Sequence, residues 1–120
     1  MIIIDTNVWI SFFKGEKKAL LIKDLIIENQ SILHPYIYGE LLLGRIADKA
    51  GYMLQALEMT SVLDKNLVYR FIKENKLHGR GIGWVDVNIL MSALSGNHQV
   101  YTYDENLRKL CMDFNCSINY

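Results

Sequence analysis

Short apolar runs alternate with amphipathic segments along the whole of this 120-residue chain, and that alternation constrains the fold more than any other feature. Parallel neighbouring strands need a crossover connection, which is usually a helix. The order therefore predicts an α/β fold in which a mostly parallel central sheet lies between layers of helices, a three-layer α/β/α arrangement. At this length we expect residues 1–120 to form a single domain.

The expected elements follow from the spacing of apolar residues and from the positions of Gly, Pro and Asp. Strands are predicted over 2–5, 31–34, 60–63 and 99–103, with a final strand over 116–120. Helices are predicted over 7–13, 16–29, 35–51, 52–58, 65–77, 84–96 and 104–114. Open α/β sheets bind ligands in the crevice outside the carboxyl ends of their strands, so residues that follow the strands are the candidate ligand-binding residues.

Charge and cysteine content exclude several classes of protein. Lys and Arg together number 13, as do Asp and Glu, so no overall field attracts nucleic acid and any RNA contact needs a local basic patch. Cys111 and Cys116 are too few for a disulfide scaffold, and with His98 they would still lack a fourth zinc ligand. No run approaches the roughly 18 apolar residues of a membrane span. We expect a cytoplasmic protein with no membrane contact.

Three aspartates stand where predicted elements meet. Asp5 ends the first strand, Asp104 follows the strand over 99–103, and both would point to the same edge of a parallel sheet. Asp86 stands near the start of a helix whose expected buried face is marked by four apolar residues, Val87, Leu90, Met91 and Leu94. Asp is also a favoured N-cap residue, so each of the three could simply cap the helix beside it.

Glu40 is harder to explain as a structural residue. At 100° per residue it falls at the centre of a helix face that it shares with apolar and small residues. Those neighbours are Tyr36, Ile37, Leu43, Gly44 and Ala47. We therefore expect Glu40 to be buried, and a buried carboxylate needs a partner, either a distant arginine or a cation.

If the four acids converge, their charges repel one another until positive charge fills the space between them. Hard oxygen ligands select Mg²⁺ or Mn²⁺ in preference to zinc. Such ions polarise a phosphoryl group and generate hydroxide at neutral pH, alone or as a pair. The pattern is thus typical of phosphodiester hydrolysis.

Four stretches, taken in order, resemble the PIN-domain family, and in particular VapC-type toxins of toxin–antitoxin pairs. The stretches are "MIIIDTNVWI", "YGELLLG", "GIGWVDVNILMSAL" and "VYTYDENL", and together they span almost the whole chain. The resemblance implies a PIN-like fold and a metal-dependent endoribonuclease. In that family the acids matching Asp5, Glu40, Asp86 and Asp104 surround Mg²⁺ or Mn²⁺ and cleave RNA.

The resemblance also assigns supporting positions. Thr6, Asn7 and Thr102 match polar residues that line or brace the site. Asn106 is a departure, because many members carry a further acid there; asparagine can bond a water or a metal ligand but adds no charge. Whether one or two metals bind stays open.

The resemblance further implies an RNA substrate, a homodimer, and a VapB-like antitoxin that occludes the site. The loop "GRGIG" fails the spacing of a dinucleotide-binding loop and is interpreted as a flexible loop beside the site, where Arg80 could contact RNA phosphate or only solvent. The alternative reading is a catalytically silent PIN-like module that binds RNA or a protein partner. A phosphatase is a more distant third.

Overall fold

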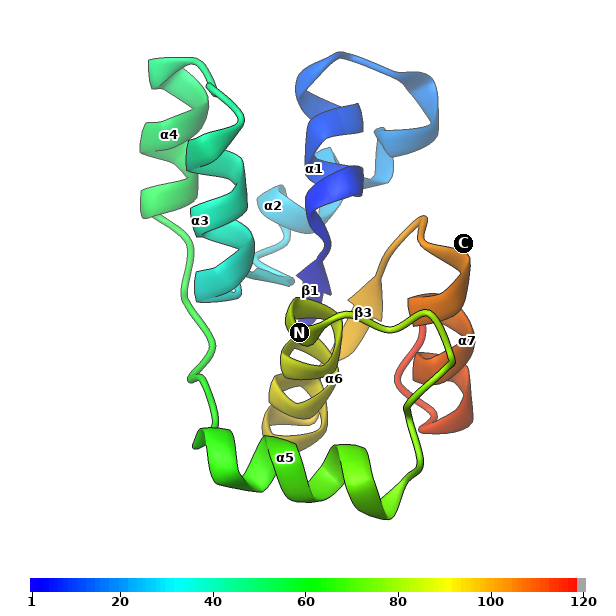
Figure 1. Ribbon diagram of the computed structural model, residues 1–120. Helices are drawn as coiled ribbons and strands as arrows, with labels where there is room; N and C mark the ends of the chain where they lie inside the picture. The colour runs from blue at the N-terminus through cyan, green and yellow to red at the C-terminus, as the bar shows by residue number, and fades with distance from the viewer. Residues whose placement is uncertain (119–120) are drawn as a thin grey trace.

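The computed structural model describes residues 1–118 and shows an α/β fold around a parallel sheet (Figure 1). The sheet contains β1 (Ile2–Ile4), β2 (Ser31–Ile32) and β3 (Gln99–Tyr101) in the order β2-β1-β3. Ile3 of the central strand pairs with Ile32 on one side and with Val100 on the other, both in parallel register. The predicted α/β class with a parallel sheet is confirmed.

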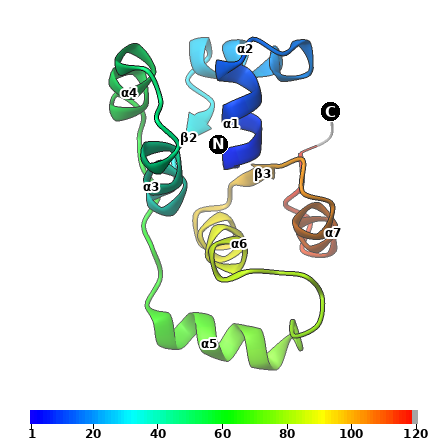
Figure 2. The same cartoon turned by 45° about the horizontal axis from the view of Figure 1, so that its top comes forward.

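Helices enclose this small sheet. They are α1 (Thr6–Phe13), α2 (Leu21–Ile27), α3 (Pro35–Leu43), α4 (Asp48–Gln55), α5 (Lys65–Glu74), α6 (Trp84–Gly96) and α7 (Glu105–Asp113), with a 3-10 turn η1 (Lys17–Ala19) before α2. In Figure 2, α1 and α2 lie on one side of the strands and α6 lies on the other, while α5 packs outside α6. The central strand is therefore covered on both faces, which explains its unbroken run of isoleucines.

The hydrophobic core forms where these layers meet. Ile3 and Ile4 of β1, Trp9 of α1 and Ile89 of α6 are fully buried. β1 is held on both faces by these contacts and on both edges by neighbouring strands. The position of Asp5, which follows Ile4, is therefore fixed by this central strand.

The helix predicted over 35–51 is two helices. Gly44 caps α3, and Arg45 takes a left-handed backbone conformation with φ of 58°, which no α-helix can continue through. The chain restarts as α4 at Asp48. The helix predicted over 16–29 is likewise shorter, since it begins as the 3-10 turn η1 and becomes α-helical only at Leu21.

The strand predicted over 60–63 is wrong. The only pairing there is one isolated parallel bridge between Leu33 and Met59, and the residues that follow lack strand structure. The short β2 offers too little edge to extend the ladder. At the other edge Ser117 bridges Val100, so part of the strand predicted over 116–120 pairs as expected, and residues 119–120 lie outside the described residues.

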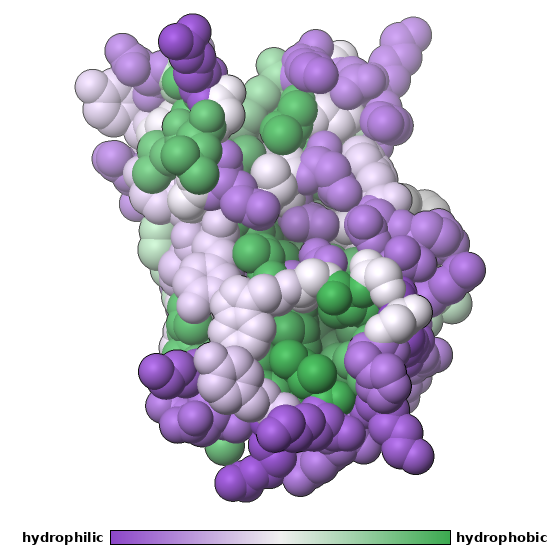
Figure 3. All heavy atoms as spheres, in the orientation of Figure 1, coloured by the Kyte–Doolittle hydropathy of each residue, from purple (hydrophilic) through white to green (hydrophobic). Residues whose placement is uncertain are grey.

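The surface is largely polar on the face shown in Figure 3, and apolar residues gather there in a hollow above α5. Within the described residues, no helix combines the length and apolar character needed to cross a membrane.

Candidate active site at the carboxyl end of the sheet

The structure brings all four predicted acids to one cleft. Asp5 follows β1, Glu40 lies on α3, Asp86 lies on α6 and Asp104 precedes α7. The cleft has a volume of about 270 Å³, and its other lining residues are Thr6, Asn7, Ile10 and Val85. Four segments far apart in the sequence thus contribute one carboxylate each, at the sheet edge where α/β folds bind ligands.

Asp5 is the most rigidly held of the four. Its side chain is 7% exposed, and its backbone N–H donates to Tyr101 O at 2.9 Å, which continues the β1–β3 pairing. Oδ1 accepts from Thr6 N at 2.8 Å and so caps α1, while Oδ2 accepts from Thr102 Oγ1 at 2.6 Å. Burial raises the pKa of Asp5, the two hydrogen bonds oppose that rise, and the charges of Asp86 and Glu40 add to it.

Asp86 lies in the first turn of α6 as its third residue. The N-cap position belongs to Gly83, whose N–H donates to Asp86 Oδ2 at 3.0 Å. Burial raises the pKa of Asp86, the bond from Gly83 opposes the rise, and the charges of Asp104 and Glu40 increase it further. The negative charges of neighbouring carboxylates therefore contribute to the raised pKa values of both Asp5 and Asp86.

Asp104 is exposed at the mouth of the cleft and caps α7, with Oδ1 accepting from Leu107 N at 2.8 Å. Its own N–H donates to Thr102 Oγ1 at 3.0 Å. Because the same hydroxyl donates to Asp5, buried Thr102 ties the two aspartates together. The prediction that these aspartates cap helices is confirmed for Asp5 and Asp104. A capping carboxylate can also bind a metal ion.

Glu40 is exposed, so the expectation of a buried glutamate is wrong. The face on which that expectation depended does not exist, since α3 ends at Leu43 and the Leu43 side chain is 88% exposed. Glu40 Oε1 accepts a 2.6 Å hydrogen bond from Thr6 Oγ1. Among the described residues Glu40 has no ion pair, so the distant arginine is not found there.

Of the remaining predicted residues, Asn7 lines the cleft, and Asn106 and Arg80 do not. Asn7 lines the cleft and its Oδ1 accepts from Tyr103 N at 3.2 Å, which joins α1 to the segment after β3. Asn106 is exposed and its amide lies against Gly81, outside the cleft lining. Arg80 pairs with Asp113 at 2.9 Å, so a phosphate would have to compete with that carboxylate.

Two lining residues, Ile10 and Val85, were not anticipated from the sequence. They form an apolar wall beside the carboxylates. Their positions, five residues after Asp5 and one before Asp86, gave the only signal that could have identified them. An apolar wall lowers the local dielectric and so strengthens the repulsion between the acids.

The chemistry of this set of ligands fits a hard divalent cation. The described lining contains four carboxylates and neither a basic side chain nor a histidine. As the side chains stand, no three of the described Asp, Glu, His and Cys side chains are grouped closely enough to hold a metal ion. Three of the acids instead bond backbone N–H groups, and Glu40 bonds Thr6.

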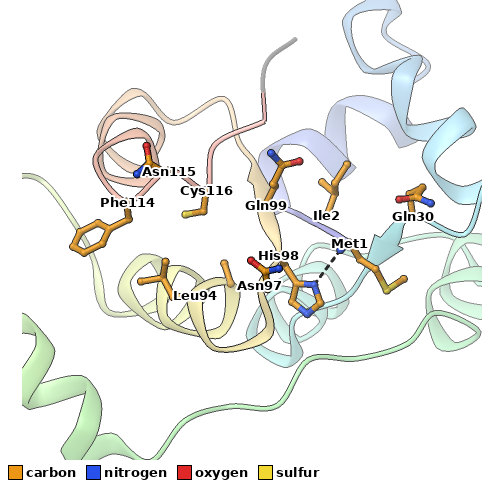
Figure 4. Close-up of a pocket in the computed structure, with 11 residues that line it drawn as sticks. Met1, Ile2, Gln30, Leu94, Asn97, His98, Gln99, Phe114, Asn115 and Cys116 are labelled. Carbon is orange, nitrogen blue, oxygen red and sulfur yellow. Dashed lines mark hydrogen bonds between the residues drawn. The ribbon is translucent and has the colours of Figure 1, made fainter.

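A second hollow, of about 400 Å³, lies at the opposite end of the strands (Figure 4). Met1, His98 and Cys116 are among its lining residues, and no carboxylate side chain lines it in the described part of the chain. It lacks the clustered charge that distinguishes the acidic cleft.

Comparison with known proteins identifies the family. The PIN domain model matches residues 2–112. Two proteins named Ribonuclease VapC32, from Mycobacterium tuberculosis strains CDC 1551 / Oshkosh and ATCC 25618 / H37Rv, are each 34% identical over 116 residues, covering 94% of this chain and 92% of the relative. The chain therefore belongs to the PIN-domain family and, within it, to the VapC type.

Proposed function

We propose that this protein is a metal-dependent endoribonuclease, the toxin of a toxin–antitoxin pair, and that it hydrolyses RNA phosphodiester bonds at the acidic cleft. The observation that carries this proposal is the convergence of Asp5, Glu40, Asp86 and Asp104 from four separate elements. The name of the VapC32 relatives supports the choice of RNA as substrate. Two free cysteines fit a reducing cytoplasm.

Mg²⁺ or Mn²⁺ is the cofactor that the carboxylates fit. Bound there, such an ion would polarise the phosphoryl group and lower the pKa of a water molecule. Asp5 and Asp86, whose pKa values are raised by burial and by neighbouring charge, gain most from a cation, because it removes the repulsion that burial intensifies. Thr102 orients Asp5, and Thr6 holds Glu40 at the mouth of the cleft.

The catalytically silent alternative finds support in the helix caps, because Asp5 and Asp104 each have a structural task. Glu40 separates the two readings. It is exposed, caps no helix, and still lies at the same cleft. Its one side-chain hydrogen bond, from Thr6, joins α3 to α1 and leaves Glu40 Oε2 without a hydrogen-bond partner among the described residues, which supports the catalytic reading.

Asp5→Asn tests the proposal. Asparagine retains an oxygen that can cap α1 but removes one metal-binding charge, so Mg²⁺-dependent cleavage of single-stranded RNA should fall about 100-fold or more. Asp24→Asn, in the first turn of α2, is the matched control. Unchanged cleavage in Asp5→Asn, or in excess EDTA, would contradict the metal mechanism, and RNA binding without cleavage by the wild type would establish the silent module.

We also propose that the protein forms a homodimer and is inhibited by a VapB-like antitoxin. A mainly apolar groove of about 640 Å³ runs between α1 and the α3–α4 turn, and it contains Ile10, Phe13 and Met53. Ile10 also lines the acidic cleft, so a partner in the groove would lie beside the acids. Lys14, Arg45 and Lys49 are the basic lining residues and favour an acidic partner.

Met53→Asp tests the partner proposal. A charge in the groove should weaken inhibition by the co-expressed antitoxin and leave cleavage by the free toxin unchanged. Equal inhibition of both proteins would place the antitoxin elsewhere. Light scattering of the free protein measures the homodimer directly.

A further inference from the structure

A second feature of the molecule lies next to the acidic cleft and has no role in the proposed hydrolysis. It is a hollow of about 170 Å³ between α5 and the start of α6, and Figure 3 shows apolar residues gathered in this part of the surface. Its lining residues are Ile72, Leu77, His78, Ile82, Gly83, Trp84 and Val87. Apart from His78 and the glycine backbone, the walls are apolar or aromatic.

Trp84 keeps a large aromatic side chain partly in contact with solvent. It is 42% exposed, whereas Trp9, the other tryptophan, is fully buried. The Trp84 ring also contacts Tyr69 of α5, with ring centroids 5.5 Å apart and planes tilted by 41°. This contact holds the indole in place without covering it, so a flat ring system is presented at the edge of the hollow.

The hollow and the acidic cleft are connected through the backbone of residues 83–86. Gly83 lines the hollow, and its N–H donates to Asp86 Oδ2 at 3.0 Å. Trp84 belongs to the hollow and Val85 to the cleft. A group bound in the hollow would thus contact residues that adjoin Asp86 in the chain, so a nucleotide whose phosphate enters the cleft could place its base there.

We propose that this hollow is a nucleobase subsite, in which one unpaired base of the RNA stacks on Trp84 while the phosphate next to it enters the acidic cleft. This inference rests on the proposed ribonuclease function. Stacking on an aromatic side chain suits any base and strengthens binding about 10-fold or more. His78 offers a polar edge that could favour some bases over others, and the subsite selects single-stranded RNA because a paired base cannot enter it.

Tryptophan fluorescence gives a direct test, since Trp9 is buried and Trp84 is the solvent-accessible emitter. A short single-stranded RNA is titrated into Asp5→Asn in EDTA, so that no cleavage occurs. Stacking should quench the Trp84 emission, and Asp5→Asn combined with Trp84→Phe should bind the RNA without that signal. RNA binding that leaves the emission of the Trp84-containing protein unchanged would overturn the subsite.

Cleavage kinetics test the same subsite from the substrate side. Trp84→Ala should raise KM about 10-fold with little change in kcat, and Tyr52→Ala, which removes an exposed aromatic residue of α4, should change neither. Because Trp84→Ala could disturb packing, RNA with an abasic nucleotide on either side of the cleaved bond provides a second measurement. One abasic position should reproduce the loss in wild type and add nothing in Trp84→Ala.

The outcomes separate this inference from the proposed function. If the wild type cleaves RNA and neither Trp84→Ala nor any abasic position matters, the subsite is wrong and the nuclease stands. If the wild type neither binds nor cleaves RNA, both are wrong. If Trp84→Ala weakens inhibition by the antitoxin and leaves cleavage unchanged, the hollow binds protein and the nucleobase assignment is overturned.

Discussion

Two polar groupings in this molecule meet the cost of burial in opposite ways. His34, which caps α3, is fully buried, and its Nδ1 accepts from Tyr36 N at 3.0 Å. Nε2 must then carry the proton and donates to Ser92 Oγ at 3.2 Å, and Ser92 donates in turn to Ser61 O at 2.9 Å. In this His34 hydrogen-bond network each donor has an acceptor, and the network requires a neutral imidazole. Burial lowers the pKa of His34 to about 4.

The acidic cleft has the contrary design. Asp5 and Asp86 lie in one cleft with other carboxylates; burial raises their pKa values, the neighbouring negative charges raise them further, and hydrogen bonds oppose the rise. The hydrogen bonds of the His34 network are all made within the fold and stabilise it. The cleft carries unbalanced charge that a cation can neutralise, and such conflict within a fold is typical of functional sites.

The largest expected effect separates stability from activity. His34→Ala leaves a cavity and deprives Tyr36 N and Ser92 of a partner, so it should lower the free energy of unfolding by about 4 kcal/mol. The activity of each folded molecule should survive. Urea denaturation measures the change, with His78→Ala on the exposed loop as the control. A stability loss below about 1 kcal/mol would mean that the His34 network matters little.

Acid should destabilise the protein through the same residue. The pKa of His34 is near 4 in the folded state and 6.5 in the unfolded chain, so the unfolded chain takes up the proton first. Stability is therefore retained above pH 6.5 and lost as the pH falls from 6.5 to 4, by about 3 kcal/mol.

The titration of Asp5 and Asp86 opposes this loss of stability in acid, because a carboxyl group with a raised pKa in the folded state favours folding at low pH. The comparison with His34→Asn isolates the histidine, since asparagine can cap α3 but does not titrate. Parallel stability curves for the two proteins between pH 4 and 6.5 would refute the assignment.

Mg²⁺ should stabilise the cleft and leave the His34 network unaffected. A ligand that binds only the folded state adds about 2.7 kcal/mol at 100 times its Kd, so the Tm should rise with Mg²⁺ and fall back in EDTA. Asp5→Asn should respond weakly to Mg²⁺, because one metal-binding charge is gone. An equal response from both proteins would show that the ion binds elsewhere.

The smallest effect concerns Thr102, a positioning residue between Asp5 and Asp104. Thr102→Val removes the hydroxyl that donates to Asp5 Oδ2, so the pKa of Asp5 should rise further and cleavage should fall about 10-fold. The acid limb of the kcat–pH profile should move to higher pH, and Thr102→Ser should restore both. A lower rate without that movement would indicate a purely structural role.

The sequence was sufficient to predict that the four acids lie at one cleft, and their catalytic role stays a prediction. Asp5, Asp86 and Asp104 each adjoin a buried strand or helix with a clear apolar pattern, so their approximate place at one end of the sheet followed from periodicity and strand direction. Glu40 was correctly associated with them, but for a wrong reason. Helical periodicity assumes that the helix continues, and the left-handed Arg45 ends it before the expected face can form.

The order of apolar and amphipathic segments and the places of the acids along it were enough to predict the α/β class, the parallel sheet and the set of acids, because alternating strands and helices allow few arrangements. Only the tertiary structure decided the exposure of Glu40, the bond from Thr102 to Asp5, and the hollow beside Trp84. The first depends on where α3 ends, and the other two depend on how separate segments pack against one another. The periodicity of one segment does not say how closely another segment approaches it. The packing of the whole chain sets that separation.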